Sequence, residues 1–144
     1  MLSTKIIRII SKTHKFIYRV SKGRIGSRLG QLDFMLLTTT GRKTGKNRIV
    51  PLPIIRHNGN YLLVASFGGN DIHPSWLLNI RQNPIVLIKI GSEAKRASAL
   101  IVETTDIGYE EMWEKVSSTY SGYNKYKEST CRPIAIVIVK KLIN

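Results

Sequence analysis

Cysteine is nearly absent from this chain, and long apolar runs are missing altogether. The single cysteine, Cys131, cannot form a disulfide within the chain. It adjoins a β-type run, so we expect a packed thiol rather than a nucleophile. No apolar run approaches the ~20 residues that span a bilayer. The N-terminal charges are not followed by the apolar core and cleavage site of a signal peptide, so neither segment is expected.

Motifs for metal binding and nucleophilic catalysis are also missing. The three histidines (His14, His57 and His73) are scattered and have no HExxH or CxxC companion. No GxSxG or Walker sequence is present. We therefore predict no metal site. His73 beside Pro74 is the histidine most worth mutating, although a surface role is favoured for it.

Acidic residues are few. The chain has 9 acidic against 23 Lys and Arg residues, a formal net charge of +14 and a pI of about 10.2. Eight basic residues precede Asp33, which is the first acidic one. Such an excess favours an anionic partner, which could be nucleic acid, an anionic membrane surface or an anionic ligand.

The N-terminal basic residues follow a helical period. Six of them, spaced by three or four positions, share one stripe: Lys5, Arg8, Lys12, Lys15, Arg19 and Lys22. An apolar stripe lies opposite: Leu2, Ile6, Ile9, Ile10, Phe16, Ile17 and Val20. Two interpretations stay open. The helix packs its apolar stripe on the body, or it lies on anionic lipid.

A glycine-containing basic linker follows the helix, with Gly23, Gly26 and Gly30. We therefore predict a helix and linker over residues 1–30 and one folded body over residues 31–144. The chain of 144 residues is long enough for one substantial core.

The body alternates β-type runs with turn signals. The expected strands are 33–40, 48–56, 61–66, 85–90, 97–103 and 134–139. Asn58-Gly59 and Gly91-Ser92 mark hairpin turns. Helices are expected over 75–81, after Pro74, and from an N-cap at Asp106 to about residue 119. Six strands with few helices predict an α+β fold built on a small antiparallel barrel.

The segment Leu36–Pro53, LLTTTGRKTGKNRIVPLP, reads as a hairpin with a cationic tip. Arg42, Lys43 and Lys46 lie in its turn and Arg48 follows. Arginine forks and lysine charges suit an anion, most plausibly a phosphate. A merely solvated turn is the alternative.

Two further patterns favour a flat ligand. Small residues from Ala65 to Gly69 would let a planar ring approach the backbone, whose N–H groups could bond ring carbonyls, although an ordinary glycine loop would look the same. Tyr120, Tyr123 and Tyr126 recur every three residues and would share a helical face. Packing alone could explain these tyrosines.

Three longer stretches carry a resemblance: TTTGRKTGKNRIVPLPIIRHNGNYLLVASFGGNDIHPSWLLNI, then RQNP, and later YSGYNKYKESTCRPIAIVIV. Together they resemble the deazaflavin-dependent nitroreductase family, whose members bind the 8-hydroxy-5-deazaflavin coenzyme F420. The resemblance covers roughly Leu36 to Val139. It implies a mainly antiparallel split β-barrel, like the flavin-binding reductases, with two or three helices besides the N-terminal one. It also implies hydride transfer from reduced coenzyme F420 to a flat acceptor such as a quinone, activated alkene or nitroaromatic.

The resemblance also implies a set of cofactor-binding residues. These are Arg42, Lys43, Thr44, Arg48, Val50, Pro51, Ala65, Ser66, Phe67, Ser75, Trp76, Leu77, Asn79 and Tyr123. The hairpin residues would hold the phosphodiester and the acidic oligoglutamate tail. Tyr123, and after it Tyr120 and Tyr126, would be catalytic at the substrate mouth. Some relatives have a polar residue where Phe67 stands, and Arg132 would brace the site.

Other readings remain. A split barrel that binds FMN, haem or a lipid would share the scaffold without needing a cationic hairpin. A nucleic-acid module is less favoured, because aromatic residues do not interleave the basic stripe. The expected partners are a small-molecule acceptor and, through residues 1–22, an anionic membrane. The expected location is the cytoplasm or the inner face of the cell membrane. Both a monomer and a homodimer are compatible with the sequence.

Overall fold

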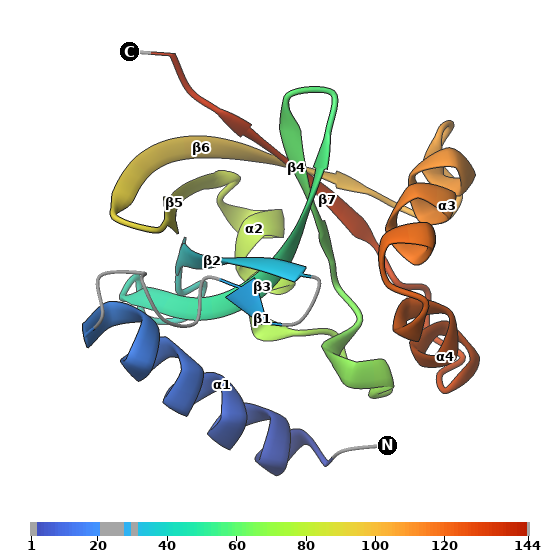
Figure 1. Cartoon of the computed structure of the whole chain (residues 1–144), viewed down its shortest axis with the longest axis horizontal. Helices are drawn as coiled ribbons and strands as arrows, with labels where there is room; N and C mark the ends of the chain where they lie inside the picture. The colour runs from blue at the N-terminus through green and yellow to red at the C-terminus, as the bar shows by residue number, and fades with distance from the viewer. Residues whose placement is uncertain (1–2, 21–27, 30–31, 144) are drawn as a thin grey trace.

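The computed structural model describes residues 3–20, 28–29 and 32–143, and in this part of the chain six antiparallel strands close a barrel (Figure 1). The strands are β1 (Arg28–Leu29), β2 (Leu32–Thr40), β3 (Asn47–His57), β4 (Asn60–Val64), β5 (Ile85–Ile90), β6 (Glu93–Val102) and β7 (Ile136–Lys141). Their order is β1-β2-β3-β4-β7-β6-β5, and a β2–β5 pairing closes the barrel, while β1 adds a short pairing to β2. The predicted antiparallel barrel is confirmed.

Turn residues set the register of the predicted hairpins. Asn58 and Gly59 have φ of 51° and 75°, so they form a two-residue turn that pairs His57 with Asn60. Positive φ at both turn residues matches the right-handed twist of the flanking strands. In the β5–β6 turn, Gly91-Ser92, only Gly91 has a positive φ (61°).

Helices surround the barrel on separate sides. They are α1 (Thr4–Val20), the 3₁₀ turn η1 (Phe67–Gly69), α2 (Ser75–Gln82), α3 (Tyr109–Thr119) and α4 (Gly122–Glu128). Figure 1 shows α1 along the β2–β3 hairpin, and α3 and α4 together beside β7. Helix α1 contacts β3 and η1, and α4 also contacts η1. The loop at η1 therefore lies between the N-terminal and C-terminal helices.

Strand β4 shows how the core divides. Leu63 points into the barrel, where it packs with Trp76 and Leu77 of α2. Leu62, its neighbour, points outward into a second cluster with Trp113 of α3 and Tyr123 of α4. Successive strand residues face opposite sides. An almost wholly apolar strand is therefore required here, because both of its faces are covered.

Some boundaries differ from the sequence predictions. Asp106 is not the N-cap of α3, which is Gly108 at φ 87°. The Asp106 carboxylate instead accepts a hydrogen bond from the backbone N–H of Glu103 at 2.7 Å and so closes the preceding turn. Strand β6 begins at Glu93, four residues earlier than expected, because the β5–β6 turn is tight. Strand β7 runs past the predicted end to Lys141.

Two further predictions concern Cys131 and the linker. Cys131 is exposed, so the expectation of a packed thiol is wrong; it lies in the loop before β7. The three glycines of the predicted linker lie outside the described residues, whereas Arg28–Leu29 within it form β1. In the part of the chain that the structure describes, no helix is long and apolar enough to cross a bilayer.

Candidate active site

A cavity of about 1120 Å³ lies between the β2–β3 hairpin, η1, α2, α4 and α1. Its lining draws on residues far apart in the chain: Ile7, Arg8, Ile10, Ser11, His14, Leu32, Phe34, Thr39, Gly41, Arg42, Lys43, Thr44, Arg48, Ile49, Val50, Pro51, Leu52, Pro53, Val64, Ser66, Phe67, Gly68, Pro74, Ser75, Trp76, Asn79, Tyr120, Tyr123, Lys125, Tyr126 and Ser129. The described lining thus includes five Lys or Arg residues and no Asp or Glu. An anionic ligand would meet attraction there without opposing charge.

The predicted cationic tip forms one end of this cavity. The turn is closed by hydrogen bonds from Gly41 N–H to the Lys46 carbonyl (2.8 Å) and from Gly45 N–H to the Gly41 carbonyl (2.7 Å). The Thr44 hydroxyl accepts a bond from Arg48 Nη2 at 3.3 Å and so orients that guanidinium. Arg42, Lys43 and Arg48 all line the cavity. Lys46 is exposed and is absent from the lining.

Asn79 of α2 ties this cationic end to the barrel. Its Oδ1 accepts two hydrogen bonds from Arg42, one from the backbone N–H (3.1 Å) and one from Nη1 (3.2 Å). Its Nδ2 donates to the Thr39 hydroxyl at 3.0 Å. The Asn79 side chain is buried and is largely committed to these protein partners. Asn79 therefore orients Arg42, which is a different task from the ligand contact that the resemblance implied.

The loop after β4 comes close to both α1 and α4. Phe67, Gly68 and Gly69 have φ of 45°, 61° and 78° in succession, the left-handed region that glycine adopts most easily. A Cβ on Gly68 would lie 2.8 Å from the Ile7 side chain, and one on Gly69 would lie 3.2 Å from the Tyr126 carbonyl. The small residues thus let α1 and α4 approach the loop closely. The sequence analysis had considered such a close approach only for a planar ring.

Tyr123 and Tyr126 of α4, with Tyr120 at the end of α3, form another wall. Tyr120 has extended backbone, so the prediction that the three tyrosines share one helical face is wrong for Tyr120. The Tyr120 and Tyr123 rings meet edge to face with centroids 5.2 Å apart, and Tyr126 lies 6.2 Å from Tyr123. The Tyr123 hydroxyl is buried and has no hydrogen-bond partner among the described residues. Burial, followed by the charges of Tyr126 and Tyr120, raises the pKa of Tyr123, and burial raises the pKa of Tyr126 to about 12. Both phenols are therefore neutral donors near pH 7.

The α1 side of the cavity was missed by the sequence analysis. Ile7, Ser11 and His14 line the cavity, and the His14 ring meets Phe34 at 4.7 Å between centroids. The signal was present as a spacing of four and three residues, but these positions fall between the basic and apolar stripes. The sequence analysis considered only those two stripes and so did not predict that a third face of the helix lines the cavity.

Two predicted residues lie elsewhere. Ala65 and Leu77 are fully buried in the barrel core and do not line the cavity. His73 is not part of the lining either; its Nδ1 is buried without a partner among the described residues, and burial lowers its pKa. The other predicted site residues all line the one cavity, and their roles there stay predictions.

Comparison with protein families gives one match that covers most of the chain. The family model described as F420H(2)-dependent quinone reductase matches residues 10–141. An F420H(2)-dependent quinone reductase of Mycobacterium tuberculosis is 36% identical over 132 residues, which are 90% of this chain and 89% of that protein. A second, putative protein of that description from the same species is 29% identical and covers 74% of this chain and 87% of its own.

Solved structures agree. An F420-H2 dependent reductase (FDR-A) is 37% identical, with a TM-score of 0.64, over 74% of this chain and 93% of that one. A protein described as a domain-swapped dimer is 33% identical, with a TM-score of 0.68, over 95% of this chain and 98% of its own. A haem storage protein of Vibrio cholerae, HutZ, at 14% identity and a TM-score of 0.58, shares the fold alone.

Proposed function

Because this chain belongs to the F420H(2)-dependent quinone reductase family, we propose that it transfers a hydride from reduced coenzyme F420 to a quinone in the cavity described above. The observation that carries the proposal is the arrangement of the cavity, which joins a cationic end to an apolar and aromatic wall. The deazaflavin coenzyme has two complementary parts, a flat ring for the apolar and aromatic wall and an anionic tail for the cationic end.

The described residues fit that coenzyme. Arg42, Lys43 and Arg48 would hold the phosphodiester and acidic tail, since guanidinium forks and ammonium groups bind such anions. Val50, Pro51 and Trp76 would pack on the ring region, and Ser66 and Phe67 would border it. When bound, the reduced coenzyme supplies the hydride, and the protein supplies binding and orientation.

Tyr123 is the residue proposed to act on the acceptor. Its hydroxyl, which is buried and unpartnered among the described residues, can donate a hydrogen bond to a quinone oxygen that becomes more basic as the ring is reduced. The raised pKa makes Tyr123 a donor of hydrogen bonds rather than a ready source of protons. The proton that completes the hydroquinone would then come from solvent. Tyr120 and Tyr126 would pack against the acceptor.

Steady-state turnover tests this function. Purified protein with reduced coenzyme F420 and a water-soluble quinone should oxidise the coenzyme at a rate proportional to enzyme concentration. The same assay with reduced FMN as donor should give little turnover. Turnover with FMN alone would contradict the proposal and favour an FMN-binding split barrel.

We further propose that α1 brings the cavity to an anionic membrane. Ile6 and Ile9 are 45% and 56% exposed, whereas Ile7 on the adjacent face lines the cavity. Helix α1 therefore docks on the barrel and still leaves three isoleucines of its apolar stripe about half exposed, since Ile10, which borders the cavity, is 54% exposed. Lys5 and Lys12 are exposed beside them. Isoleucines in the acyl boundary and lysines at the headgroups would suit such a surface.

Two matched variants test the membrane proposal. Ile6→Ser with Ile9→Ser should abolish sedimentation with vesicles of anionic lipid and leave turnover of a water-soluble quinone within about twofold of the parent. Ile7→Ser should lower turnover and preserve sedimentation. Unchanged vesicle binding by the double variant would rule out this surface.

A further inference from the structure

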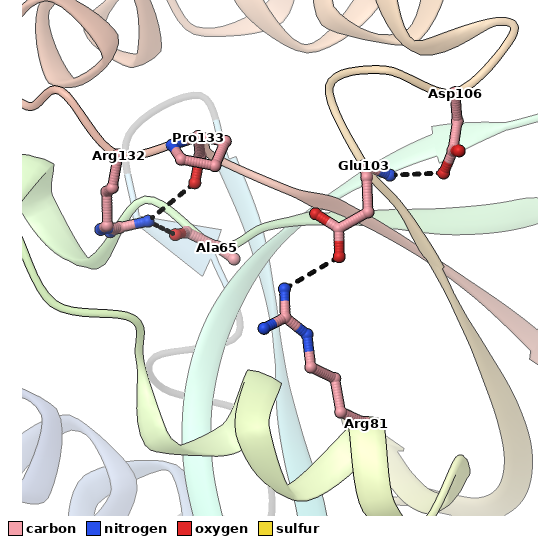
Figure 2. Close-up of polar contacts among 6 residues, drawn as sticks. All are labelled: Ala65, Arg81, Glu103, Asp106, Arg132 and Pro133. Atoms are coloured by element: carbon pink, nitrogen blue, oxygen red, sulfur yellow. Dashed lines mark hydrogen bonds and ion pairs between the residues drawn. The ribbon is translucent and has the colours of Figure 1, made fainter.

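Arg132 is bound almost entirely by backbone carbonyls. Its Nε donates to the Asn70 carbonyl (2.7 Å), its Nη2 to that of Ser66 (2.7 Å), and its Nη1 to those of Ala65 (3.1 Å) and Pro133 (3.4 Å). Figure 2 shows the guanidinium beside Ala65 and Pro133. Three of these carbonyls, those of Ala65, Ser66 and Asn70, belong to the loop that borders the cavity. Arg132 therefore fixes the backbone of this loop.

The direction of each carbonyl also fixes the direction of the N–H group in the same peptide unit. In a trans peptide the N–H of the next residue points opposite to the carbonyl, and the described chain has no cis peptide. Because the Ala65 and Ser66 carbonyls point to Arg132, the N–H groups of Ser66 and Phe67 point away from it. Ser66 and Phe67 line the cavity. The side of the loop that faces away from Arg132 therefore carries these two N–H groups.

The loop needs such support. Phe67 has φ of 45°, a left-handed backbone conformation that is unfavourable for any residue other than glycine. Asn70 secures the same residue from the other end, since its Nδ2 donates to the Phe67 carbonyl at 2.7 Å. A strained conformation that several hydrogen bonds hold in place is typical of ligand-binding backbone.

We propose that Arg132 is a positioning residue, which holds the N–H groups of Ser66 and Phe67 toward the cavity so that they bind an oxygen at the edge of the deazaflavin ring. This inference rests on the proposed function, because it takes the ring as the ligand. The role differs from that of the hairpin, which meets the tail.

The test uses two probes, the intact oxidised coenzyme and a deazaflavin that lacks the phosphate tail. Arg132→Met should weaken binding of the tail-free ring at least tenfold and move its absorption maximum toward that of the free ring. Arg132→Lys should lie between the parent and Arg132→Met. Arg42→Ala should weaken only the intact coenzyme.

Arg81 offers a matched control. It is also an arginine on this side of the barrel, but it pairs with the Glu103 carboxylate at 2.8 Å and does not touch the loop (Figure 2). Arg81→Met should therefore leave both the affinity and the absorption maximum of the bound ring unchanged. Equal losses in Arg81→Met and Arg132→Met would indicate a general effect on stability and overturn the proposal.

A second variant removes a donor without touching Arg132. Ser66 has φ of −75°, which proline adopts, so Ser66→Pro deletes one N–H and keeps the carbonyl. It should weaken binding of the tail-free ring as Arg132→Met does. If Arg132→Met does not fold, Arg132→Lys and Ser66→Pro decide.

The outcomes separate the two levels of the proposal. Parent protein that binds neither probe overturns both the function and this inference. Parent protein that binds the ring, while Ser66→Pro and the folded Arg132 variants bind it equally well with the same absorption maximum, overturns only the role of Arg132.

Discussion

Replacement of Asn79 by alanine should lower coenzyme affinity only through Arg42. The Asn79 amide makes two hydrogen bonds to Arg42 and one to Thr39, and it is 3% exposed. At ~0.5–1.5 kcal/mol net for each of the three bonds, Asn79→Ala should lower the free energy of unfolding by about 1.5–4.5 kcal/mol. The buried Thr39 hydroxyl would lose its amide donor, which adds to the cost.

The expected effects on binding follow from the same contacts. Arg42→Ala removes a charge-assisted contact to the tail, worth ~1.5–3 kcal/mol, or a loss of ~10- to 150-fold in affinity. Asn79→Ala should cost about tenfold, because it frees the Arg42 guanidinium to sample other rotamers. In the double variant the loss of affinity should equal that of Arg42→Ala alone within about twofold. Such non-additivity would mean that Asn79 acts on the coenzyme through Arg42.

Fluorescence titration with oxidised coenzyme F420 gives the four affinities, and urea unfolding gives the four stabilities. Asn83→Ala is the matched control, because Asn83 also bonds the β2 end, through the Thr40 hydroxyl at 3.4 Å, without touching Arg42. It should leave the affinity unchanged. Additive losses in the Arg42/Asn79 double variant would refute this reasoning and would favour a direct contact between Asn79 and the coenzyme.

Three other predictions concern tyrosines and α4. Burial raises the pKa of Tyr109 to about 12, and the Tyr109 hydroxyl donates to the Ile134 carbonyl at 2.6 Å. The stability that the neutral phenol contributes is therefore complete below pH ~10, the ordinary pKa of tyrosine, and is lost as pH rises through about 12. Tyr109→Phe should therefore unfold more easily in urea at pH 7 and lose less stability than the parent between pH 9 and 12; equal slopes would contradict this. Tyr123→Phe should lower kcat/KM for a quinone about tenfold, the loss of one neutral hydrogen bond of ~1.5 kcal/mol, while coenzyme affinity stays the same. Because burial raises the pKa of Tyr123, the parent should show no alkaline limb from this residue between pH 6 and 9, and an alkaline limb that Tyr123→Phe abolishes would count against the assignment. Asn124→Ala removes the acceptor of the Trp113 Nε1 bond (2.9 Å) that joins α3 to α4, so it should lower thermal stability and raise KM for the quinone more than for the coenzyme; an unchanged KM would show that α4 does not depend on this bond.

Local sequence was sufficient for much of the barrel and of the cationic end. Asn58-Gly59 fixes a hairpin wherever it falls between β-type runs, and the structure has this turn. The tip with Arg42, Lys43 and Arg48 is likewise a local feature, and it lines the cavity. Both predictions depend only on neighbours in the chain and agree with the structure, whereas the equally local prediction of an N-cap at Asp106 was wrong.

Features that depend on tertiary contacts could not be predicted. The docked face of α1 is set by the space beside Phe34 and Gly68, so Ile7 and His14 escaped an analysis of stripes. The hydrogen bonds of Asn79 could not be predicted either, because only the folded chain brings Arg42 and Thr39 to its amide. The sequence predicted the end of α3 near residue 119, but it also placed Tyr120 on one helical face with Tyr123 and Tyr126. Tyr120 is instead extended (ψ 104°), and α4 begins only at Gly122.

The most direct test of the central claim is a parallel fluorescence titration of the protein with oxidised coenzyme F420 and with FMN, at low and at moderate salt. Coenzyme F420 should bind at micromolar concentration or below, more weakly as salt screens the cationic end, and the double variant Arg42→Ala with Lys43→Ala should lose most of this affinity. FMN should bind far more weakly. Tighter binding of FMN, or coenzyme binding that neither salt nor the double variant changes, would contradict the claim that this cavity reads a deazaflavin by its anionic tail.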